Sequence, residues 1–423
     1  MGRGWTWWLW PFLTLFAAGA APDGRARRPL ESAADVGEPK IIQEAEAESL
    51  LRLKDGTLFL AGTKSSFISK DQGATWTRQR PLSGHIIQRR DGSFYVLDEK
   101  TRPGSTGGTY VGRCLRFRTV QEIETLSQTD WSEIPVRVER WTPLTGDDGH
   151  TDVPSLNITG PILELSDGSL IVASYGNFAG DTVPMEGFVP DKGQKWFKYR
   201  TYLLASRDGG ASWNYLSTVA YDGETGQESF CEPGIVELGD GELVAVMRTG
   251  RFAPMYQARS RDGGRTWSRP QSLHTLGLAP QLTLLPGGTL ACSFGWRPTK
   301  NQVVGGGRPA ELALRDYNQR YRTDVGLEDP SAAAGDYIMF SFDRGQTWSR
   351  PRQIARALTV GYTRVVGIRR NACLVLSQRL VIPGESAQSV QLKWASDWAK
   401  WVHKSRRVVE ARVVSIKGKD SAQ

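Results

Sequence analysis

The chain alternates short apolar runs with turn residues, and one pattern recurs along most of its length. In five copies an Asp-Gly or Gly-Gly turn separates two apolar runs: LLRLKDGTLFLAG, IIQRRDGSFYVLD, ILELSDGSLIVAS, IVELGDGELVAVM and LTLLPGGTLACSF. A sixth copy, VVGIRRNACLVLS around Asn371, keeps the apolar spacing with a poorer turn. Apolar runs joined by such turns are typical of β-hairpins. The pattern therefore predicts six hairpins.

A second repeat of eight residues, here called the box, follows four of these hairpins. Its copies are SKDQGATW (69–76), SRDGGASW (206–213), SRDGGRTW (260–267) and SFDRGQTW (341–348). Asp and Gly suit a tight turn, and the Trp can pack between layers of structure. We expect the missing second and sixth boxes near Ser127 to Trp131 and near Trp394 to Trp398.

Together the repeats predict an all-β fold, a six-bladed β-propeller of four-stranded antiparallel blades over residues 41–403. Repeated sheets that cannot bury both faces alone are stabilised by stacking radially. The alternatives are a linear β-solenoid or two β-sandwiches, whose repeats are shorter or lack a box at this spacing.

The two ends of the chain differ from the repeats. Residues 1–20 combine Arg3, an apolar run and the small residues of Ala18-Gly19-Ala20, the pattern of a cleaved signal peptide. An uncleaved anchor is the rival interpretation, but the apolar run is shorter than the roughly 20 residues that span a bilayer. We expect a secreted or periplasmic protein without stable membrane insertion after cleavage, with a linker at 21–40 and a polar tail at 404–423.

Composition narrows the function classes. The hydrophobic fraction of 39% among 423 residues excludes a wholly disordered chain. The net charge of +8 is scattered, with no basic block and no nucleic-acid-binding module, so we expect no nucleic-acid partner. The four cysteines lie singly, which predicts small buried side chains and no metal or other cofactor. A mildly basic surface still attracts anionic substrates.

Propeller geometry predicts where chemistry would lie. In a four-stranded blade the Asp-Gly turns and the boxes share one face, and the starts of first strands and ends of second strands converge on the opposite mouth of the channel. The residues at these positions include His85, Asp98, Glu99, Lys100, Arg102, Asp148, His150, Asp152, Tyr175, Asn177, Asp181, Glu232, Arg248, Arg297, Tyr362 and Arg364.

The repeated box, S-x-D-x-G-x-T-W, resembles the Asp-box (BNR repeat) of the sialidase, or neuraminidase, superfamily. The segment EPGIVELGDGELVAVMRTG is similar to the family segment that carries a glutamate and an arginine, here Glu232 and Arg248. LAPQLTLLPGGTLACSFGWRP resembles the third-arginine segment and gives Arg297. GYTRVVGIRRNACLVL resembles the segment of the family's tyrosine and gives Tyr362.

The resemblance implies a retaining glycoside hydrolase. Arg248 and Arg297 would hold the substrate carboxylate through paired hydrogen bonds, since guanidinium groups match carboxylates in shape and charge. A neutral tyrosine avoids repulsion by that carboxylate, so Tyr362 would be the nucleophile and Glu232 its base. A further acid would protonate the leaving oxygen.

The sequence departs from the family in its first blade. The stretch EAEAESLLRLKDG has acids where the family has an arginine, and no catalytic aspartate follows that blade's second strand. Arg52 lies too close to the turn to replace the arginine. We therefore predict that Asp152 is the general acid, in preference to Asp181 or Asp98. We expect Asp181 to be a substrate-binding residue. A further cation would come from Arg102 or Lys100.

Structural explanations remain open for the matched residues. Glu232 and Arg248 would then form an ion pair across a hairpin, Arg297 would pair with an inserted loop, and Tyr362 would line the channel. The leading hypothesis is an enzyme that cleaves terminal sialic acid or a similar acidic sugar from glycans. The alternatives are a propeller that binds an acidic glycan without cleaving it and a propeller enzyme for a different acidic sugar. The oligomeric state stays open.

Overall fold

The computed structural model describes residues 34–42, 47–138, 141–142, 156–185, 197–250, 253–296, 303–304, 308–309, 335–356, 361–386 and 405–416. These ranges fold almost entirely into strands, so the all-β class is confirmed. Their helices are two short 3-10 turns, η1 (Val120–Glu124) and η2 (Gln128–Asp130). In these ranges no helix is long and apolar enough to cross a membrane. The predicted signal peptide at 1–20 lies outside the described residues.

Three sheets have four strands each in a simple sequential order. The first contains β3 (Ser49–Arg52), β4 (Leu58–Ala61), β5 (Ser66–Ser69) and β6 (Thr77–Gln79). The second contains β17 (Cys231–Gly239), β18 (Glu242–Arg248), β19 (Pro254–Ser260) and β20 (Gln271–Leu276). The third contains β21 (Leu278–Leu284), β22 (Leu290–Trp296), β25 (Gly335–Ser341) and β26 (Arg352–Arg356).

A ten-stranded sheet stands where two separate blades were expected. It contains β7 (His85–Gln88), β8 (Phe94–Leu97), β9 (Arg102–Pro103), β10 (Thr109–Phe117), β11 (Ser132–Arg137), β12 (Trp141–Thr142), β13 (Leu163–Glu164), β14 (Leu170–Phe178), β15 (Arg200–Ser206) and β16 (Trp213–Ala220). Its two halves join because β11 pairs with β16 in parallel, at Val136 with Trp213 and at Arg137 with Asn214. This pairing explains why the expected set of separate four-stranded sheets is not seen.

The last sheet joins the two ends of the described chain. It contains β1 (Ala34–Val36), β2 (Lys40–Ile42), β27 (Arg364–Arg369), β28 (Ala372–Val381) and β29 (Arg406–Ile416). The expected tail at 404–423 is therefore wrong for the residues in β29, which pair along β28. The linker at 21–40 is likewise wrong for β1, which pairs with β29. A separate two-stranded sheet contains β23 (Val303–Val304) and β24 (Arg308–Pro309).

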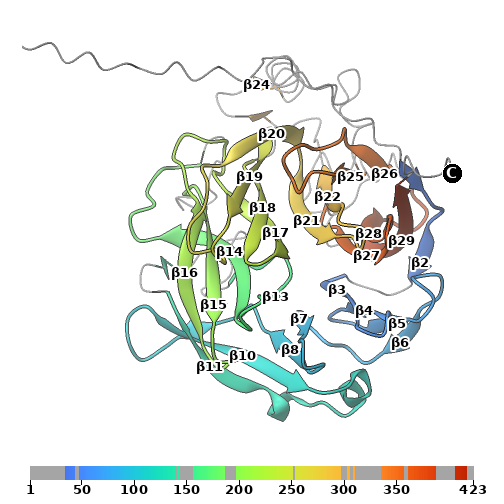
Figure 1. Cartoon of the computed structure of the whole chain (residues 1–423), viewed down its shortest axis with the longest axis horizontal. Coiled ribbons are helices and arrows are strands. Elements are labelled where there is room, and N and C mark those ends of the chain that lie inside the picture. The colour runs from blue at the N-terminus through green and yellow to red at the C-terminus, as the bar shows by residue number, and fades with distance from the viewer. Residues whose placement is uncertain are drawn as a thin grey trace, which may run out of the picture.

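Each of the six predicted hairpins forms an antiparallel pair: β3–β4, β7–β8, β13–β14, β17–β18, β21–β22 and β27–β28. The sheets that contain them stand around a common centre, with the N-terminal and C-terminal sheets side by side (Figure 1). Apolar side chains fill the space between neighbouring sheets. One such cluster closes the ring, since Leu58 and Leu60 of β4 pack with Leu374 and Leu376 of β28.

Each box forms the turn between the third and fourth strands of its sheet. In the first copy Asp71 Oδ1 accepts hydrogen bonds from Ser69 Oγ at 2.8 Å and from Thr75 N at 2.9 Å. The same bonds recur at Asp208, and Ser69 Oγ accepts from Gly73 N at 2.8 Å. The box is thus a self-contained hydrogen-bonded turn, as its sequence indicated.

The Trp of each box packs between its own sheet and the preceding one. Trp213 is completely buried, and its indole Nε1 donates to Tyr95 Oη of β8 at 2.8 Å. The predicted second box, at Ser127 to Trp131, is the short turn η2 instead. A hydrogen bond from Ser127 N to Asp130 Oδ2, at 2.7 Å, closes this turn. The predicted sixth box, near Trp394 to Trp398, lies outside the described residues.

Candidate active site

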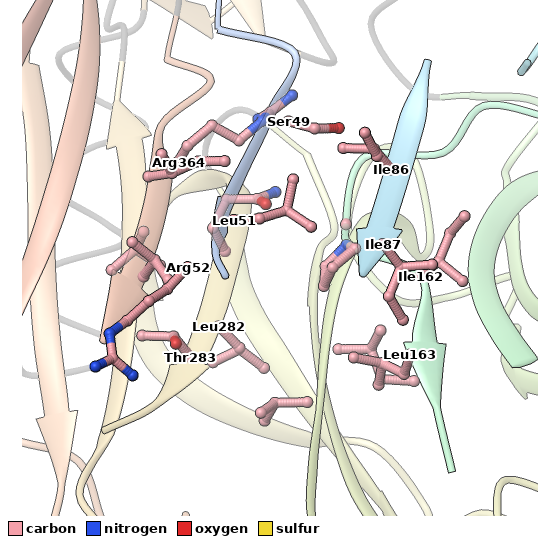
Figure 2. Close-up of a pocket in the computed structure, with 18 of the residues that line it drawn as sticks. Ser49, Leu51, Arg52, Ile86, Ile87, Ile162, Leu163, Leu282, Thr283 and Arg364 are labelled. Carbon is pink, nitrogen blue, oxygen red and sulfur yellow. The ribbon is translucent and has the colours of Figure 1, made fainter. Parts of the chain in front are cut away.

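A cavity of about 420 Å³ lies at the centre of the ring, lined by the first strands of the six hairpins. Apolar side chains such as Ile86, Ile162 and Leu282 form most of its wall (Figure 2). Arg364 lies at the same end of the cavity as Ser49, the first residue of β3, whereas Arg52 lies toward the other end (Figure 2). Arg52 is therefore no replacement for the arginine that the family carries in its first blade. We call the end with Arg364 the mouth.

Glu232 is presented at the mouth by an irregular start of β17. Its φ of 47° is in the left-handed region, which is rare for a non-glycine residue and typical of functional sites. The pairing of β17 with β18 shifts register between Cys231 and Gly234. The first strand of the next sheet, β21, has a similar irregular start, with a φ of 46° at Ala279. The Ala279 amide donates to Glu232 Oε2 at 3.0 Å. Two irregular strands thus fix one carboxylate.

Tyr362 meets this carboxylate from just before β27, whose sheet lies beyond the one that contains Ala279. Its phenol donates a hydrogen bond to Glu232 Oε1, with 2.5 Å between the oxygens. The residue directly precedes Thr363 and strand β27, and its carbonyl accepts from Gln378 Nε2 of β28 at 3.1 Å. Residues 130 positions apart in the sequence therefore form a phenol–carboxylate pair.

Arg248, at the end of β18, stands between two carboxylates. Its Nη1 donates to Glu232 Oε1 at 2.9 Å, and its Nη2 donates to Glu228 Oε1 at 2.7 Å. All three side chains are almost completely buried. Burial by itself lowers the pKa of Arg248, but the two carboxylates outweigh it and hold the pKa well above its usual value. Arg248 therefore stays charged and holds Glu232 in place.

Sequence reasoning missed Glu228. The signal that pointed to it was a second acid four residues before Glu232, in the turn that leads into the same strand. Nearby, Cys231 Sγ donates to Glu228 Oε2 at 3.4 Å. Burial, reinforced by the charge of Glu228, raises the pKa of this thiol well above its usual value. All four cysteines are buried and unpaired, as the sequence predicted.

A second group of titratable side chains lies where the first and second hairpins begin. Glu48 Oε2 accepts from the Gly84 amide at 3.2 Å, and burial raises the pKa of this carboxyl above its usual value. His85 Nε2 lies 3.6 Å from Glu99 Oε2. The hydrogen bond from His85 lowers the pKa of Glu99. Glu48 belongs to the acidic stretch that stands where the family has its first arginine.

Arg364 reaches this second group from β27. Its Nε donates to the Glu48 carbonyl at 2.6 Å, and its Nη1 donates to the Thr363 carbonyl at 2.8 Å. Burial lowers the pKa of the guanidinium to about 10, and the nearby carboxylates of Glu48 and Glu99 offset only part of this effect. Arg364 nevertheless carries its charge at neutral pH.

The other predicted residues have different surroundings. Asp181 pairs with Arg200, at 2.5 Å from Nη2 to Oδ1 and 3.0 Å from Nε to Oδ2. Asp98 Oδ2 accepts from Arg113 Nη2 at 2.6 Å. The structure thus brings together Tyr362, Glu232 and Arg248, but it does not join Asp181 or Asp98 to them.

The remaining predicted site residues are either away from Tyr362 and Glu232 or outside the described residues. Arg102 pairs with Glu133 at 2.8 Å on an exposed surface. Asp152 and Arg297 are outside the described residues. Within the described ranges, no group of three or more His, Cys, Asp or Glu side chains is arranged to hold a metal ion.

Two family models match this chain. A BNR repeat-like domain matches residues 131–288, and a BNR/Asp-box repeat matches residues 339–350. The second match overlaps the fourth box. These matches confirm the Asp-box (BNR) repeats that the sequence indicated. None of the curated proteins matches the chain.

Several solved structures are similar to this chain at low sequence identity. A Dyadobacter fermentans protein of unknown function is 17% identical with a TM-score of 0.55, covering 91% of this chain and 100% of its own. The Hadza microbial sialidase Hz136 is 16% identical with a TM-score of 0.49, covering 78% and 62%. A Trypanosoma rangeli sialidase in complex with sialic acid is 11% identical with a TM-score of 0.42, covering 93% and 58%. This chain thus spans about three fifths of each of these two sialidases.

Proposed function

We propose that this chain, which carries the BNR repeats of the sialidase superfamily, is a secreted retaining glycoside hydrolase. It would cleave terminal sialic acid or a similar acidic sugar from glycans. The observation that carries the proposal is the 2.5 Å hydrogen bond from the Tyr362 phenol to Glu232. A phenol is a weak nucleophile at neutral pH, and a carboxylate in direct contact is the group that activates it. The proposal includes a six-bladed propeller in which β11–β16 pairing merges two blades.

The first step forms a covalent glycosyl–enzyme intermediate. Tyr362 Oη attacks the anomeric carbon, and its proton passes to Glu232 Oε1 as the bond forms. The bond from the anomeric carbon to the leaving oxygen breaks, and a general acid supplies the proton that this oxygen needs. Because the nucleophile is neutral before attack, the negative charge of the substrate carboxylate does not repel it.

The second step releases the sugar. Water attacks the anomeric carbon from the face that the leaving group vacated, so the configuration is retained overall. The general acid, now deprotonated, accepts the proton of the water. The departing Tyr362 oxygen regains its proton from Glu232. Both residues return to their starting states.

Two carboxyl groups are candidates for the general acid. Asp152 is the one that the sequence favours. Glu48 is the described candidate, because it lies at the mouth and its pKa is raised by burial. A raised pKa keeps a carboxyl protonated closer to neutral pH, as a general acid requires. Activity of Asp152→Asn and Glu48→Gln variants decides between them.

The substrate carboxylate would be held by arginines. Arg297 and Arg248 are the residues that the resemblance implies. Arg248 already donates one hydrogen bond from each terminal nitrogen to Glu232 or Glu228, so one hydrogen on each of these nitrogens is left, together with the buried Nε, which has no hydrogen-bond partner in the described part of the chain. Its larger contribution is to orient Glu232 and balance its charge.

A non-catalytic propeller that binds acidic glycans is the second candidate. The observation in its favour is Glu48 at the start of β3, where the family's first blade has an arginine. A lectin-like site would need the cations of the mouth but not the phenol. This candidate predicts binding that survives the loss of Tyr362.

Turnover of a fluorogenic sialoside and of a panel of uronate-containing glycans tests the proposal. Wild type is compared with Tyr362→Phe and Glu232→Gln, and with Tyr215→Phe as the matched control. Tyr215 is exposed and bonds only locally to Thr218, so its loss removes a phenol without touching the mouth. We expect turnover by wild type and the control and its loss in the other two. Binding of a glycan without turnover by wild type would favour the second candidate.

A further inference from the structure

Arg364 differs from Arg248 and Arg200 in having no acidic partner among the described residues. Arg248 binds two carboxylates and Arg200 binds Asp181, whereas Arg364 forms no ion pair within the described chain. Its Nε and Nη1 each donate to a main-chain carbonyl, and no described residue accepts a hydrogen bond from Nη2. A permanently charged group with unused donors is therefore fixed at the mouth.

The acidic side chains near Arg364 are committed elsewhere. The carboxylate of Glu48 turns to the Gly84 amide at 3.2 Å, and only its main-chain oxygen contacts the guanidinium. Glu99 pairs with His85. Tyr362, the third titratable group near Arg364, donates its proton to Glu232. None of these groups lies within ion-pair distance of Arg364.

This cation is held close to the candidate nucleophile. Tyr362 and Arg364 are two residues apart, and Gln378 of β28 joins their segment to the start of the first blade. The Gln378 amide nitrogen donates to the Tyr362 carbonyl at 3.1 Å and to the Ala47 carbonyl at 3.3 Å. Ala47 N in turn donates to Gln378 Oε1 at 3.4 Å. One buried amide thus ties the main chain at Tyr362, two residues before Arg364, to the main chain at the start of the first blade.

We propose that Arg364 binds the carboxylate of the sugar, supplying from the last sheet the cation that the first blade lacks. Its guanidinium lies against the Glu48 main chain, which is where the family resemblance places the absent arginine. The side chain lines the cavity together with Glu48. Figure 2 shows it at the same end of the cavity as Ser49. The identity of the ligand as an acidic sugar rests on the proposed function.

The energetic reason is the cost of a charge that is partly removed from water and has no ion-pair partner among the described residues. Removing a cation from water without a counter-ion is unfavourable, and two main-chain carbonyls compensate only in part. A ligand carboxylate at Nη2 would add the missing charge and a charge-assisted hydrogen bond. A neutral ligand would gain only the hydrogen bond. Arg364 therefore selects for an anionic sugar.

Equilibrium binding of N-acetylneuraminate and glucuronate, followed by calorimetry, tests the inference without relying on turnover. Arg364→Met keeps the apolar stem and removes the charge, and Arg364→Lys keeps the charge without the planar fork. Arg369→Gln is the matched control, because Arg369 lies at the exposed far end of the same strand, β27. The methyl ester of N-acetylneuraminate is the neutral reference ligand.

We expect Arg364→Met to weaken carboxylate binding at least tenfold, which corresponds to about 1.4 kcal/mol. Arg364→Lys should lie between Arg364→Met and wild type, and Arg369→Gln should bind as wild type does. The ester keeps only the hydrogen bond, so Arg364→Met should weaken its binding by much less than it weakens binding of the acid. Wild-type affinity for both acids in the Arg364 variants would overturn the inference, as would failure of wild type to bind either acid.

A structure of the wild-type protein with N-acetylneuraminate keeps the test decisive if Arg364→Met does not fold. The inference expects the carboxylate within hydrogen-bond distance of Arg364 Nη2, and a carboxylate bound elsewhere overturns it. Failure of the proposed function looks different. In that case the acid binds at Arg364, but no glycoside is hydrolysed.

Discussion

The box turns and the mouth lie on opposite faces of the ring and are built in opposite ways. Each box satisfies its own hydrogen bonds within eight residues, as the Asp262 carboxylate does with Ser260 and Thr266. The mouth joins residues from several sheets, such as Glu232 and Tyr362, through side chains that have no counterpart in the other repeats. The face with the boxes repeats the same hydrogen-bonded turn, whereas the mouth combines residues that each occur once.

This difference in construction means that the boxes contribute to folding stability and the mouth to the proposed chemistry. A repeated local turn tolerates the loss of one copy, because the other copies do not depend on it. The mouth has a single copy of each group, and Glu232 there adopts a strained backbone that packing must maintain. We therefore expect substitutions on the two faces to affect different measurements.

The largest effect is expected on kcat, when a carboxylate on each face, Glu232 or Asp262, is separately replaced by an amide. Glu232→Gln removes the proposed base and should lower kcat by ~10²- to 10⁴-fold, the usual contribution of general base catalysis. Asp262→Asn should leave kcat unchanged and lower the free energy of unfolding by about 1 kcal/mol through weakened hydrogen bonds. Enzyme assays and urea unfolding of both variants check this. A similar loss of kcat in both variants would contradict the separation of the faces.

The next effect concerns packing beneath a box. Gly210 has a φ of 87°, and a Cβ there would lie 2.2 Å from the Tyr95 ring. Gly210→Ala should lower the free energy of unfolding by about 2–4 kcal/mol, combining backbone strain with overpacking. Gly92→Ala is the control, because Gly92 has a φ of 92° but open space around it, so about 1 kcal/mol is expected. Equal losses in thermal or urea unfolding would mean that contact with Tyr95 is unimportant.

A smaller effect is expected from Glu228, the second partner of Arg248. Glu228→Gln keeps an oxygen acceptor near Nη2 and removes one buried negative charge. Because Arg248 then interacts more strongly with Glu232, the base should weaken, and kcat should fall about tenfold, or roughly 1.4 kcal/mol in the barrier. A pH–rate profile should show the acidic limb, which reports the ionisation of the base, shifted to lower pH. An unchanged profile would assign Glu228 a purely structural role.

The smallest effect is the response of the boxes to acid. Hydrogen bonds from Thr75 lower the pKa of Asp71 from 3.8 to about 2. A lowered folded-state pKa contributes stability that is present above pH 3.8 and is lost as the pH falls through 2. Urea unfolding should therefore show wild type more stable than Asp71→Asn at neutral pH, with the gap closing between about pH 4 and 2. A gap that stays constant with pH would contradict this explanation.

Local patterns in the sequence predicted the parts of the fold that local physics controls. The six hairpins and four boxes were visible because their turn residues and apolar runs are adjacent in the chain. Closure of the ring was not visible. Strand β29 is rich in charged residues such as Arg406 and Glu410, and it is held by pairing with β28 and with β1 from the other end of the described chain. No local pattern reports such a distant partner.

Only part of the candidate site could be predicted, because some of its residues matter through contacts between sheets. Tyr362, Glu232 and Arg248 were found through the resemblance of their segments to the family. Glu228 and Arg364 were not assigned roles, because their importance arises from contacts between sheets. The irregular backbone at Glu232 and Ala279, which aims the carboxylate, also breaks the strand periodicity on which sequence reasoning relies.

Trapping the glycosyl–enzyme intermediate tests the central claim most directly. A fluorinated sialic acid derivative with a good leaving group forms the covalent adduct and slows its hydrolysis, and peptide mass spectrometry locates the bond. The account predicts one sugar attached to Tyr362 in wild type and in Tyr215→Phe, and none in Tyr362→Phe. An adduct on another residue, or its persistence in Tyr362→Phe, would contradict it.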